Sequence, residues 1–372
     1  MLDKKIYFDC VSSTQPSPEV LKTYASLLDK YYVNANALYD EGVEIYNLQE
    51  KARANIAELL GVKTGEVIFT SGATEGNNAA IKGVAWAAAD KKHLITTIYE
   101  HSSVYSAFKQ LEEHGFNVTY LKPNEKGVIT LDEVKKALRD DTALVSIMHV
   151  NNEIGTINDI DTIGEYIKKH SNAYFHTDIT QSIGKIPVDL KNVDLATFSA
   201  HKIHGLKGSG ILVKKLNVKM DSLISGGQQE FGLRGGTSNA PADIVLAKTI
   251  RLALENMPKH EEVCKELHDY FISRLSEIKG TKINSPDGGL SCLINISTPI
   301  KSEVLMNALN LKGIMVSSKS TCGTRSHAPS RALESIGVDS DYAIRISFDT
   351  DNVKEDVDYF IECLKEIIAH YE

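Results

Sequence analysis

Apolar and polar residues alternate along this chain with two different periods, which divide it into short strands and longer helices. Short apolar runs such as "EVIFT" (66–70), "HLITTI" (93–98) and "TALVSIMHV" (142–150) have the length and the flanking residues of strands. Between them, "LQEKARANIAELLG" (48–61) and "EHSSVYSAFKQLEEHG" (100–115) repeat apolar residues at helical spacing. Apolar strands that alternate with helices predict an α/β fold, with a mostly parallel sheet covered on both faces.

The order and length of the predicted helices and strands change near residue 250. A long helix is expected over about 241–279, followed by strands in "SCLINIS", "IMVSS" and "AIRISF" and by a last amphipathic helix over 353–371. This pattern predicts a second, smaller α+β domain. We expect a large domain over residues 16–249 and a small domain formed by residues 1–15 and 250–372.

Composition excludes several classes of protein. The 372 residues are 42% hydrophobic and carry a net charge of −8, so a globular core is expected and direct binding to nucleic acid is not. No apolar run approaches the roughly 18 residues of a membrane span, and the N-terminus does not resemble a signal peptide. Five dispersed cysteines predict no disulfide framework and favour a reducing compartment, the cytoplasm (Cys10, Cys264, Cys292, Cys322 and Cys363).

Polar loops follow several of the predicted strands, which is where open α/β sheets bind ligands. The small residues of "SGATEGNN" (71–78) could place free backbone N–H groups around a phosphate, or could form an ordinary capped turn. Asp178 and Gln181 follow "AYFHT", where a carboxylate could pair with a protonated ring nitrogen or simply cap a helix.

Lys202 lies between His201 and His204 in the glycine-flanked loop "SAHKIHGLKGSG". Burial and cationic neighbours would free its amine for Schiff-base chemistry, although most lysines are solvated surface charges. No third ligand accompanies the two histidines, so no metal is predicted. Cys322 lies in the polar run "VSSKSTCGTRS" (316–326), which is unusual because cysteines are mostly buried.

Together these segments resemble one family. "TSGATEGNNAAIKG", "EHSSV", "MHVNNEIGTINDI", "FHTDITQSIGKIPVDL", "DLATFSAHKIHGLKGSGILV", "LRGGT", "SSKSTCG" and "IRISF" occur in the order found in cysteine desulfurases. These are fold type I pyridoxal-phosphate enzymes of the class V aminotransferase superfamily. The S-x-S-x-C spelling around Cys322 resembles the long-loop group, which supplies iron–sulfur cluster assembly and tRNA thiolation.

The resemblance implies a role for each matching residue. Lys202 would link covalently to pyridoxal phosphate, Asp178 would pair with its pyridine nitrogen, and Gln181 would bind its phenolic oxygen. His101 would stack over the ring. The phosphate would be held by the backbone at Ala73 and by Thr74, Ser199 and His201. Thr237 would reach the phosphate of the neighbouring subunit, which implies a homodimer. Asn152 and Arg345 would bind the carboxylate of the substrate, L-cysteine.

Cys322, on a loop of about 317–330, would attack the substrate sulfur. The products would be L-alanine and a persulfide, which a sulfur-acceptor protein, an iron–sulfur scaffold or a tRNA-thiolation enzyme, would then receive. Lys319 and Arg325 would favour the thiolate. Other reactions remain open: selenocysteine lyase, another carbon–sulfur lyase, or an aminotransferase or epimerase. A non-catalytic docking scaffold is a further alternative.

The match has gaps on the substrate side. The family's "D-N-A-A-T-T-P" is "DCVSSTQ" here, with Cys10 and Gln15 altered, and a usual histidine is Tyr39. Further departures are Leu206, Phe231 and Gly235, and "HAPS" after the cysteine. Cys10 is most simply a packing residue; the alternative is a second thiol that relays the persulfide.

Overall fold

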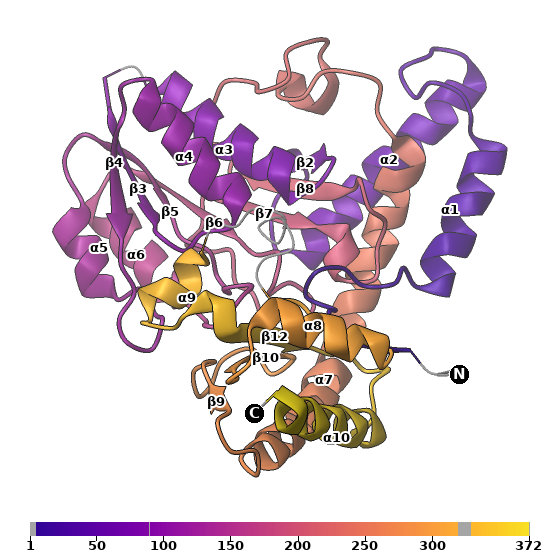
Figure 1. The fold of residues 1–372 in the computed structure, drawn as a ribbon. Coiled ribbons are helices and arrows are strands. Elements are labelled where there is room, and N and C mark those ends of the chain that lie inside the picture. Colours follow the sequence, from indigo (N-terminus) through magenta and orange to yellow (C-terminus); the bar gives the residue numbers. More distant parts are fainter. Residues whose placement is uncertain (1–4, 89, 319–328, 372) are drawn as a thin grey trace.

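The computed structural model describes residues 5–88, 90–318 and 329–371 (Figure 1). Cys322, Lys319 and Arg325 lie outside the described residues. In the described part, the largest sheet has the strand order β2-β8-β7-β6-β5-β3-β4. Its strands are β2 (Val67–Thr70), β3 (His93–Thr97), β4 (Asn117–Leu121), β5 (Thr142–Ser146), β6 (Tyr174–Asp178), β7 (Leu195–Ser199) and β8 (Gly210–Lys214). β8 runs antiparallel to both of its neighbours, β2 and β7, and the other adjacent pairs in this sheet are parallel.

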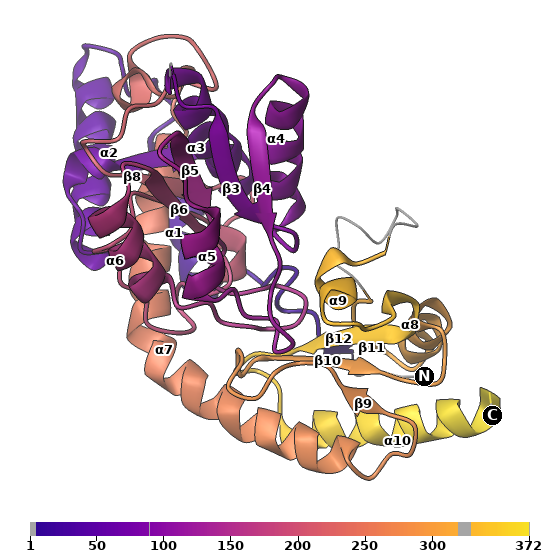
Figure 2. The same ribbon diagram turned by 90° about the vertical axis from the view of Figure 1, so that its left-hand side faces the viewer.

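Helices cover both faces of this sheet (Figures 1 and 2). α3 (Ala73–Ala87) and α4 (Ser102–Glu113) pack on one face, in a core that includes Phe108 and Leu144. The opposite face is covered by α2 (Asp40–Leu59), α5 (Leu131–Ala137), α6 (Ile160–His170) and the first half of α7 (Ala240–Leu275). Strands β3, β5 and β7 are buried along their whole length, as strands covered on both sides must be. The predicted α/β fold with a mostly parallel sheet is confirmed.

The remaining strands belong to two small sheets. β10 (Leu293–Ser297) pairs antiparallel with β12 (Ala343–Ser347) and with β9 (Lys282–Ile283), while β1 (Ile6–Tyr7) pairs parallel with β11 (Ile314–Met315). Helices α8 (Ser302–Leu311), α9 (Arg331–Ser335) and α10 (Lys354–Tyr371) complete this part. Four phenylalanine rings meet in its core, with neighbouring centroids 5.3–6.0 Å apart (Phe8, Phe271, Phe348 and Phe360).

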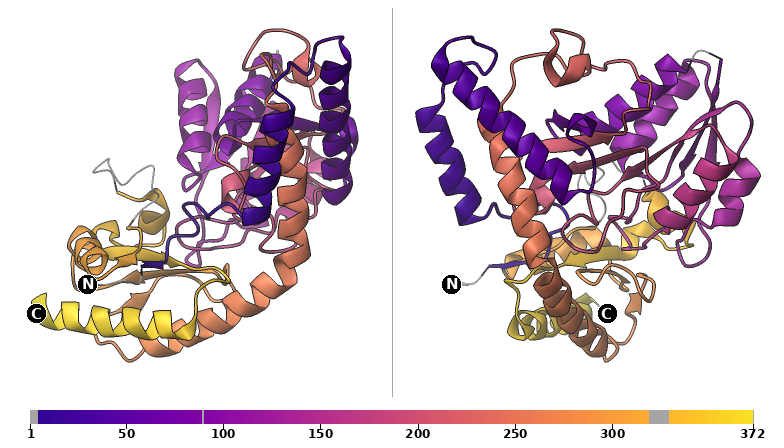
Figure 3. Two further views of the ribbon diagram at one scale, coloured as in Figure 1. Left: turned by 90° about the vertical axis from the view of Figure 1, so that its right-hand side faces the viewer. Right: turned by 180° about the vertical axis from the view of Figure 1, so that it is seen from behind.

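The long helix α7 connects these parts. α1 (Pro18–Lys30) lies beside α7, and the 36-residue α7 runs from the large sheet to the small ones with Pro258 in its interior (Figure 3). The boundary predicted at residues 249 and 250 falls inside α7, and the division into domains stays a prediction. Short 3₁₀ turns occur at Thr64–Glu66, Ala200–Lys202, Gln229–Gly232 and Ser340–Tyr342. No helix in the described ranges is long and apolar enough to cross a membrane.

Candidate active site

The candidate site begins where β6 and β7 end. Asp178 is the last residue of β6 and Ser199 the last of β7, and these strands are parallel neighbours in the sheet. The 3₁₀ turn Ala200–Lys202 follows β7 at once, so the catalytic lysine predicted from sequence is placed by the same strand end. α3 starts beside them, because the Ala73 N–H donates to Ser199 Oγ at 2.7 Å. The structure therefore brings together Ala73, Asp178, Ser199 and Lys202.

Asp178 is a buried carboxylate held in a fixed orientation. Asn77 Nδ2 donates to its Oδ2 at 2.8 Å and the Thr180 N–H donates to its Oδ1 at 2.9 Å. Asn77 also donates to Ser103 Oγ at 2.9 Å and accepts a hydrogen bond from Thr197 Oγ1. Asn77 was not singled out from the sequence, where an amide inside a helix carries no local signal. The Asn77 amide holds one carboxylate oxygen of Asp178 and so fixes the orientation of that side chain.

His101 caps the N-terminus of α4. Its Nδ1 accepts from the Ser103 N–H at 3.2 Å and lies 2.8 Å from Ser103 Oγ. Burial lowers the pKa of His101 below its ordinary value, with the nearby charge of Asp178 acting in the opposite direction. Because Nδ1 accepts the Ser103 N–H, the proton of the neutral ring sits on Nε2. A neutral, oriented imidazole suits the stacking role that the resemblance implies.

The start of α3 forms a cradle for an anion. Gly72 precedes the helix with φ of 141°, and a Cβ there would come within 3.1 Å of Ser199 Oγ, so glycine lets the backbone approach the hydroxyl. No side chain caps the helix at Gly72, which leaves first-turn N–H groups, that of the exposed Thr74 included, to bind a ligand. His201 Nδ1 lies 3.2 Å from Ser13 Oγ, and burial lowers its pKa to about 4. His201 thus offers a hydrogen bond without a charge at neutral pH.

Lys202 is half-buried and does not point into bulk water. Its Nζ donates to the backbone oxygens of Val11 at 2.7 Å and Ser12 at 2.6 Å. Thr14 holds the same two segments together, since its N–H donates to the His201 carbonyl at 2.8 Å. The N-terminal segment 9–14 is therefore one wall of the site.

Arg345 lies on β12 and is 2% exposed. Its Nη1 donates to the Asn152 carbonyl at 2.8 Å. Its Nη2 donates to Asp9 Oδ1 at 2.8 Å and to Ser12 Oγ at 2.6 Å. Asn152 and Arg345 are adjacent as expected, but the contact uses the backbone of Asn152. Ser12 was not singled out from the sequence, and it touches both the lysine and the arginine.

Gln181 joins the site to a second lysine that sequence reasoning missed. Its Nε2 donates to the Val11 carbonyl at 3.1 Å, and its Oε1 accepts from Lys185 Nζ at 2.9 Å. Both side chains are buried. Lys185 follows Gln181 by one helical turn, and this spacing is the one signal that could have paired them.

Thr237 stands apart from the other predicted phosphate ligands. It is exposed and lines a cavity of about 150 Å³ with Ser71, Glu230 and Arg234. No contact joins it to Ala73 or Ser199 within the described part of its own chain.

Cys10 is 9% exposed, and burial raises the pKa of its thiol well above the ordinary value. Cys10 is protonated at neutral pH, which favours the packing role over the relay.

The donor set fits pyridoxal phosphate. A helix N-terminus with Ser199 suits the phosphate, the anchored Asp178 carboxylate suits a protonated ring nitrogen, and Lys202 supplies an amine for the aldehyde. The Arg345 guanidinium, whose Nη2 donates to the Asp9 carboxylate, has the charge and shape to bind a carboxylate. These groups together can hold an amino acid against such a cofactor.

Comparison with known proteins agrees with this geometry. The aminotransferase class-V family matches residues 6–360. A protein named cysteine desulfurase IscS, from Clostridium botulinum, is 39% identical over 99% of this chain and 95% of its own length. A solved NifS-like protein superimposes with a TM-score of 0.92, at 37% identity, over 99% of this chain and 100% of that one. A structure described as SspA in complex with cysteine has a TM-score of 0.82 and 34% identity, and the match covers 93% of this chain and 99% of that one.

Proposed function

Because this chain belongs to the cysteine desulfurases of the class-V aminotransferase family, we propose that it moves the sulfur of L-cysteine onto Cys322 and releases L-alanine. The observation that carries the proposal is that Lys202 and Arg345 both contact the N-terminal segment 9–14, which forms one wall of the site. The same short segment contacts the Lys202 amine and the Arg345 guanidinium, at Ser12 O and Ser12 Oγ. An amino acid whose carboxylate reaches Arg345 therefore presents its α-carbon toward Lys202.

The cofactor roles that the family resemblance implies are part of the same proposal, and the contacts described above support them. Bound pyridoxal phosphate supplies an electron sink for the substrate's α-carbon. Ala73, Thr74, Ser199 and His201 would hold the phosphate, and Asp178 would keep the ring nitrogen protonated. His101 would cover the ring, and Gln181 would bind the phenolic oxygen.

Lys202 Nζ has a second task, which is to carry the substrate's α-proton. Hydrogen bonds to two backbone oxygens hold this amine at the wall of the site. Cys322 then attacks the sulfur of L-cysteine as a thiolate. The new S–S bond forms as the carbon–sulfur bond breaks, and a proton completes L-alanine. SspA, a similar protein, was solved with cysteine bound, which supports this substrate.

Three further features belong to the proposal. Thr237 reaches the phosphate site of a second subunit, so the working form is a homodimer; its exposure, away from the cradle of its own chain, supports this. A sulfur-acceptor protein takes the persulfide from Cys322. The protein works in the reducing cytoplasm, where the described cysteines, all unpaired, remain thiols.

The test is mass spectrometry of the purified holoenzyme after it reacts with L-cysteine. We expect one added sulfur atom on the peptide that contains Cys322, and equal amounts of alanine. Cys322→Ala should abolish both, while Cys363→Ser, a control on α10, should leave both unchanged. Alanine formation that persists in Cys322→Ala would refute the proposed role of this thiol.

A further inference from the structure

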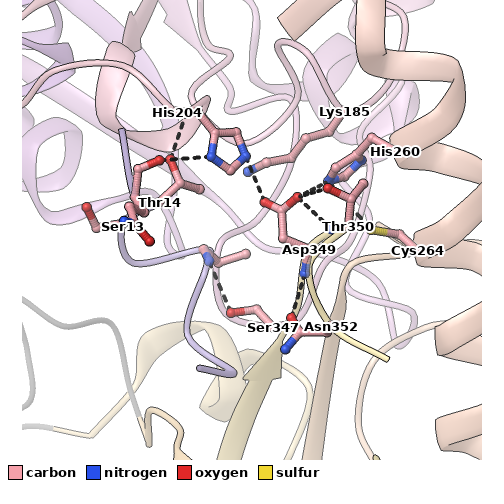
Figure 4. Close-up of polar contacts among 12 residues, drawn as sticks. Ser13, Thr14, Lys185, His204, His260, Cys264, Ser347, Asp349, Thr350 and Asn352 are labelled. Carbon is pink, nitrogen blue, oxygen red and sulfur yellow. Dashed lines mark hydrogen bonds and ion pairs between the residues drawn. The ribbon is translucent and has the colours of Figure 1, made fainter. Parts of the chain in front are cut away.

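A second cavity adjoins Lys202. Its volume is about 410 Å³, within the range of small-molecule sites. It is enclosed by the start of α1, the middle of α7, the loop after β12 and the segment that carries Lys202 and His204. Figure 4 shows the polar side chains of this region, with His204, Lys185 and His260 directed toward Asp349. Of the residues that line this cavity, only Lys202 has a role in the function proposed above.

Lys185 is the main reason to expect an anion there. It is 5% exposed and lines the cavity, and its Nζ donates to the neutral Oε1 of Gln181. Within the described residues, no carboxylate forms an ion pair with it. A buried ammonium is costly unless an anion or several dipoles compensate it. Lys259, exposed at the rim, likewise makes no ion pair in the described ranges and adds a second positive charge.

The acidic side chains of the cavity do not cancel these charges. Asp349 already pairs with His204, whose Nε2 lies 3.1 Å from Oδ2. His260 Nε2 lies 3.8 Å from Asp349 Oδ1, and burial lowers the pKa of His260, so its ring is neutral. Glu19 is exposed at the N-terminus of α1. Besides Lys202, whose Nζ donates to the Val11 and Ser12 carbonyls, two lysines face the exposed Glu19. Because Asp349 is already paired with His204, the buried end of the cavity is positive.

Uncharged polar side chains also line the cavity (Ser17, Thr249, Asn256 and Thr350), and one side of its wall is apolar. Val20 and Ile203 are buried, and Leu252 and Ala253 on α7 complete this side. A ligand with a charged end and a short hydrocarbon body would match both halves, because burial of each CH₂ contributes about 0.8 kcal/mol. A bare inorganic anion would match only the lysine end.

We propose that this cavity binds a small aliphatic carboxylate, with the carboxylate at Lys185 and the hydrocarbon chain against Ile203, Leu252 and Ala253. Such a ligand would lie next to the candidate active site, on the side of Lys185 and Lys202. Lys185 is hydrogen-bonded to Gln181, and Lys202 itself lines the cavity. Binding is therefore expected to alter the visible absorption of the bound cofactor.

Titration calorimetry of the holoenzyme with sodium hexanoate tests this proposal without L-cysteine, so a failure here leaves the desulfurase proposal intact. Saturable binding is expected, accompanied by a change in the cofactor's absorption. Hexylammonium chloride and 1-hexanol, which lack the anion, and inorganic phosphate, which lacks the chain, should bind at least tenfold more weakly.

Variants locate the site. Lys185→Met should weaken hexanoate binding at least tenfold. Asn256→Phe, an exposed position on α7 that lines the cavity, should block binding without affecting the fold, and it decides the matter if Lys185→Met does not fold. Lys265→Met, an exposed lysine on α7 outside the cavity, should bind as the wild type does. Absent binding, equal binding of hexylammonium, or full binding by Asn256→Phe would overturn the proposal.

Discussion

The ion pair between His204 and Asp349 makes a specific prediction about stability and pH. His204 Nδ1 lies 3.0 Å from the Gln15 carbonyl and Nε2 lies 3.1 Å from Asp349 Oδ2. Both nitrogens face oxygen acceptors, so only the doubly protonated ring satisfies both. The pKa of His204 is accordingly raised, chiefly by the hydrogen bond to Asp349. We predict that Asp349→Asn removes most of this effect.

The size of the effect follows from the contact. A hydrogen bond to a charged group contributes about 1.5–3 kcal/mol. The His204 side chain is 40% exposed, so solvent screening reduces the contribution to about 1–2 kcal/mol. This stabilisation is complete below the ordinary pKa of histidine, about 6.5, and is lost as the pH rises through the raised pKa of the folded state. Asp349 itself has a lowered pKa, and its contribution is lost only in acid.

Urea unfolding at pH 6 and pH 8.5 measures the difference. Asp349→Asn should lose about 1–2 kcal/mol against the wild type at pH 6, and clearly less at pH 8.5. Asp351→Asn, an exposed neighbour in the same loop, should change the free energy of unfolding by less than about 0.5 kcal/mol at either pH. An equal loss by Asp349→Asn at both pH values would refute the reasoning, because a packing defect does not follow the charge of His204.

Two other predictions concern the candidate site, and a third concerns Glu100, the buried residue directly before His101. Ser12→Ala should raise the KM for L-cysteine about three- to tenfold with little change in kcat, since Arg345 loses one of the bonds that orient it; an unchanged KM would contradict this. Burial raises the pKa of Glu100 to about 8, so the wild type should lose stability as the pH rises from about 4.5 to 8. Glu100→Gln should remove that slope in urea unfolding, and an identical slope would count against it. Asn77→Ala frees one oxygen of Asp178 and should reduce the cofactor retained after dialysis, measured by absorbance; full retention would exclude this role.

The sequence predicted the sheet well because its strands are buried on both faces. β3, β5 and β7 are apolar enough to be recognised without knowledge of their partners. The antiparallel direction of β8 was not predicted, since strand direction depends on how the chain returns to the sheet. α1 was not predicted either. Only Val20 is buried in it, so its apolar pattern is incomplete, and its packing against α7 is a tertiary contact.

The site was predictable where a strand end fixes it. Ser199 and Asp178 end parallel neighbours, so their proximity follows from topology. Asn77 and Lys185 could not be predicted in the same way, because each acts through a buried hydrogen bond to another side chain. The positions of such bonds depend on packing between elements, which leaves no pattern in one segment.

The altered N-terminal segment shows which contacts in the site depend on its side chains and which depend only on its backbone. Lys202 contacts this segment through backbone oxygens, which every residue type provides, so the changes from "D-N-A-A-T-T-P" to "DCVSSTQ" leave that contact available. Arg345 contacts it through side chains, and alanine at position 12 would provide no hydroxyl. The departures from the family therefore act on Arg345, the proposed partner of the substrate carboxylate, and not on Lys202, the proposed attachment point of the cofactor. It follows that they should alter the KM for amino acids while the affinity for the cofactor stays the same.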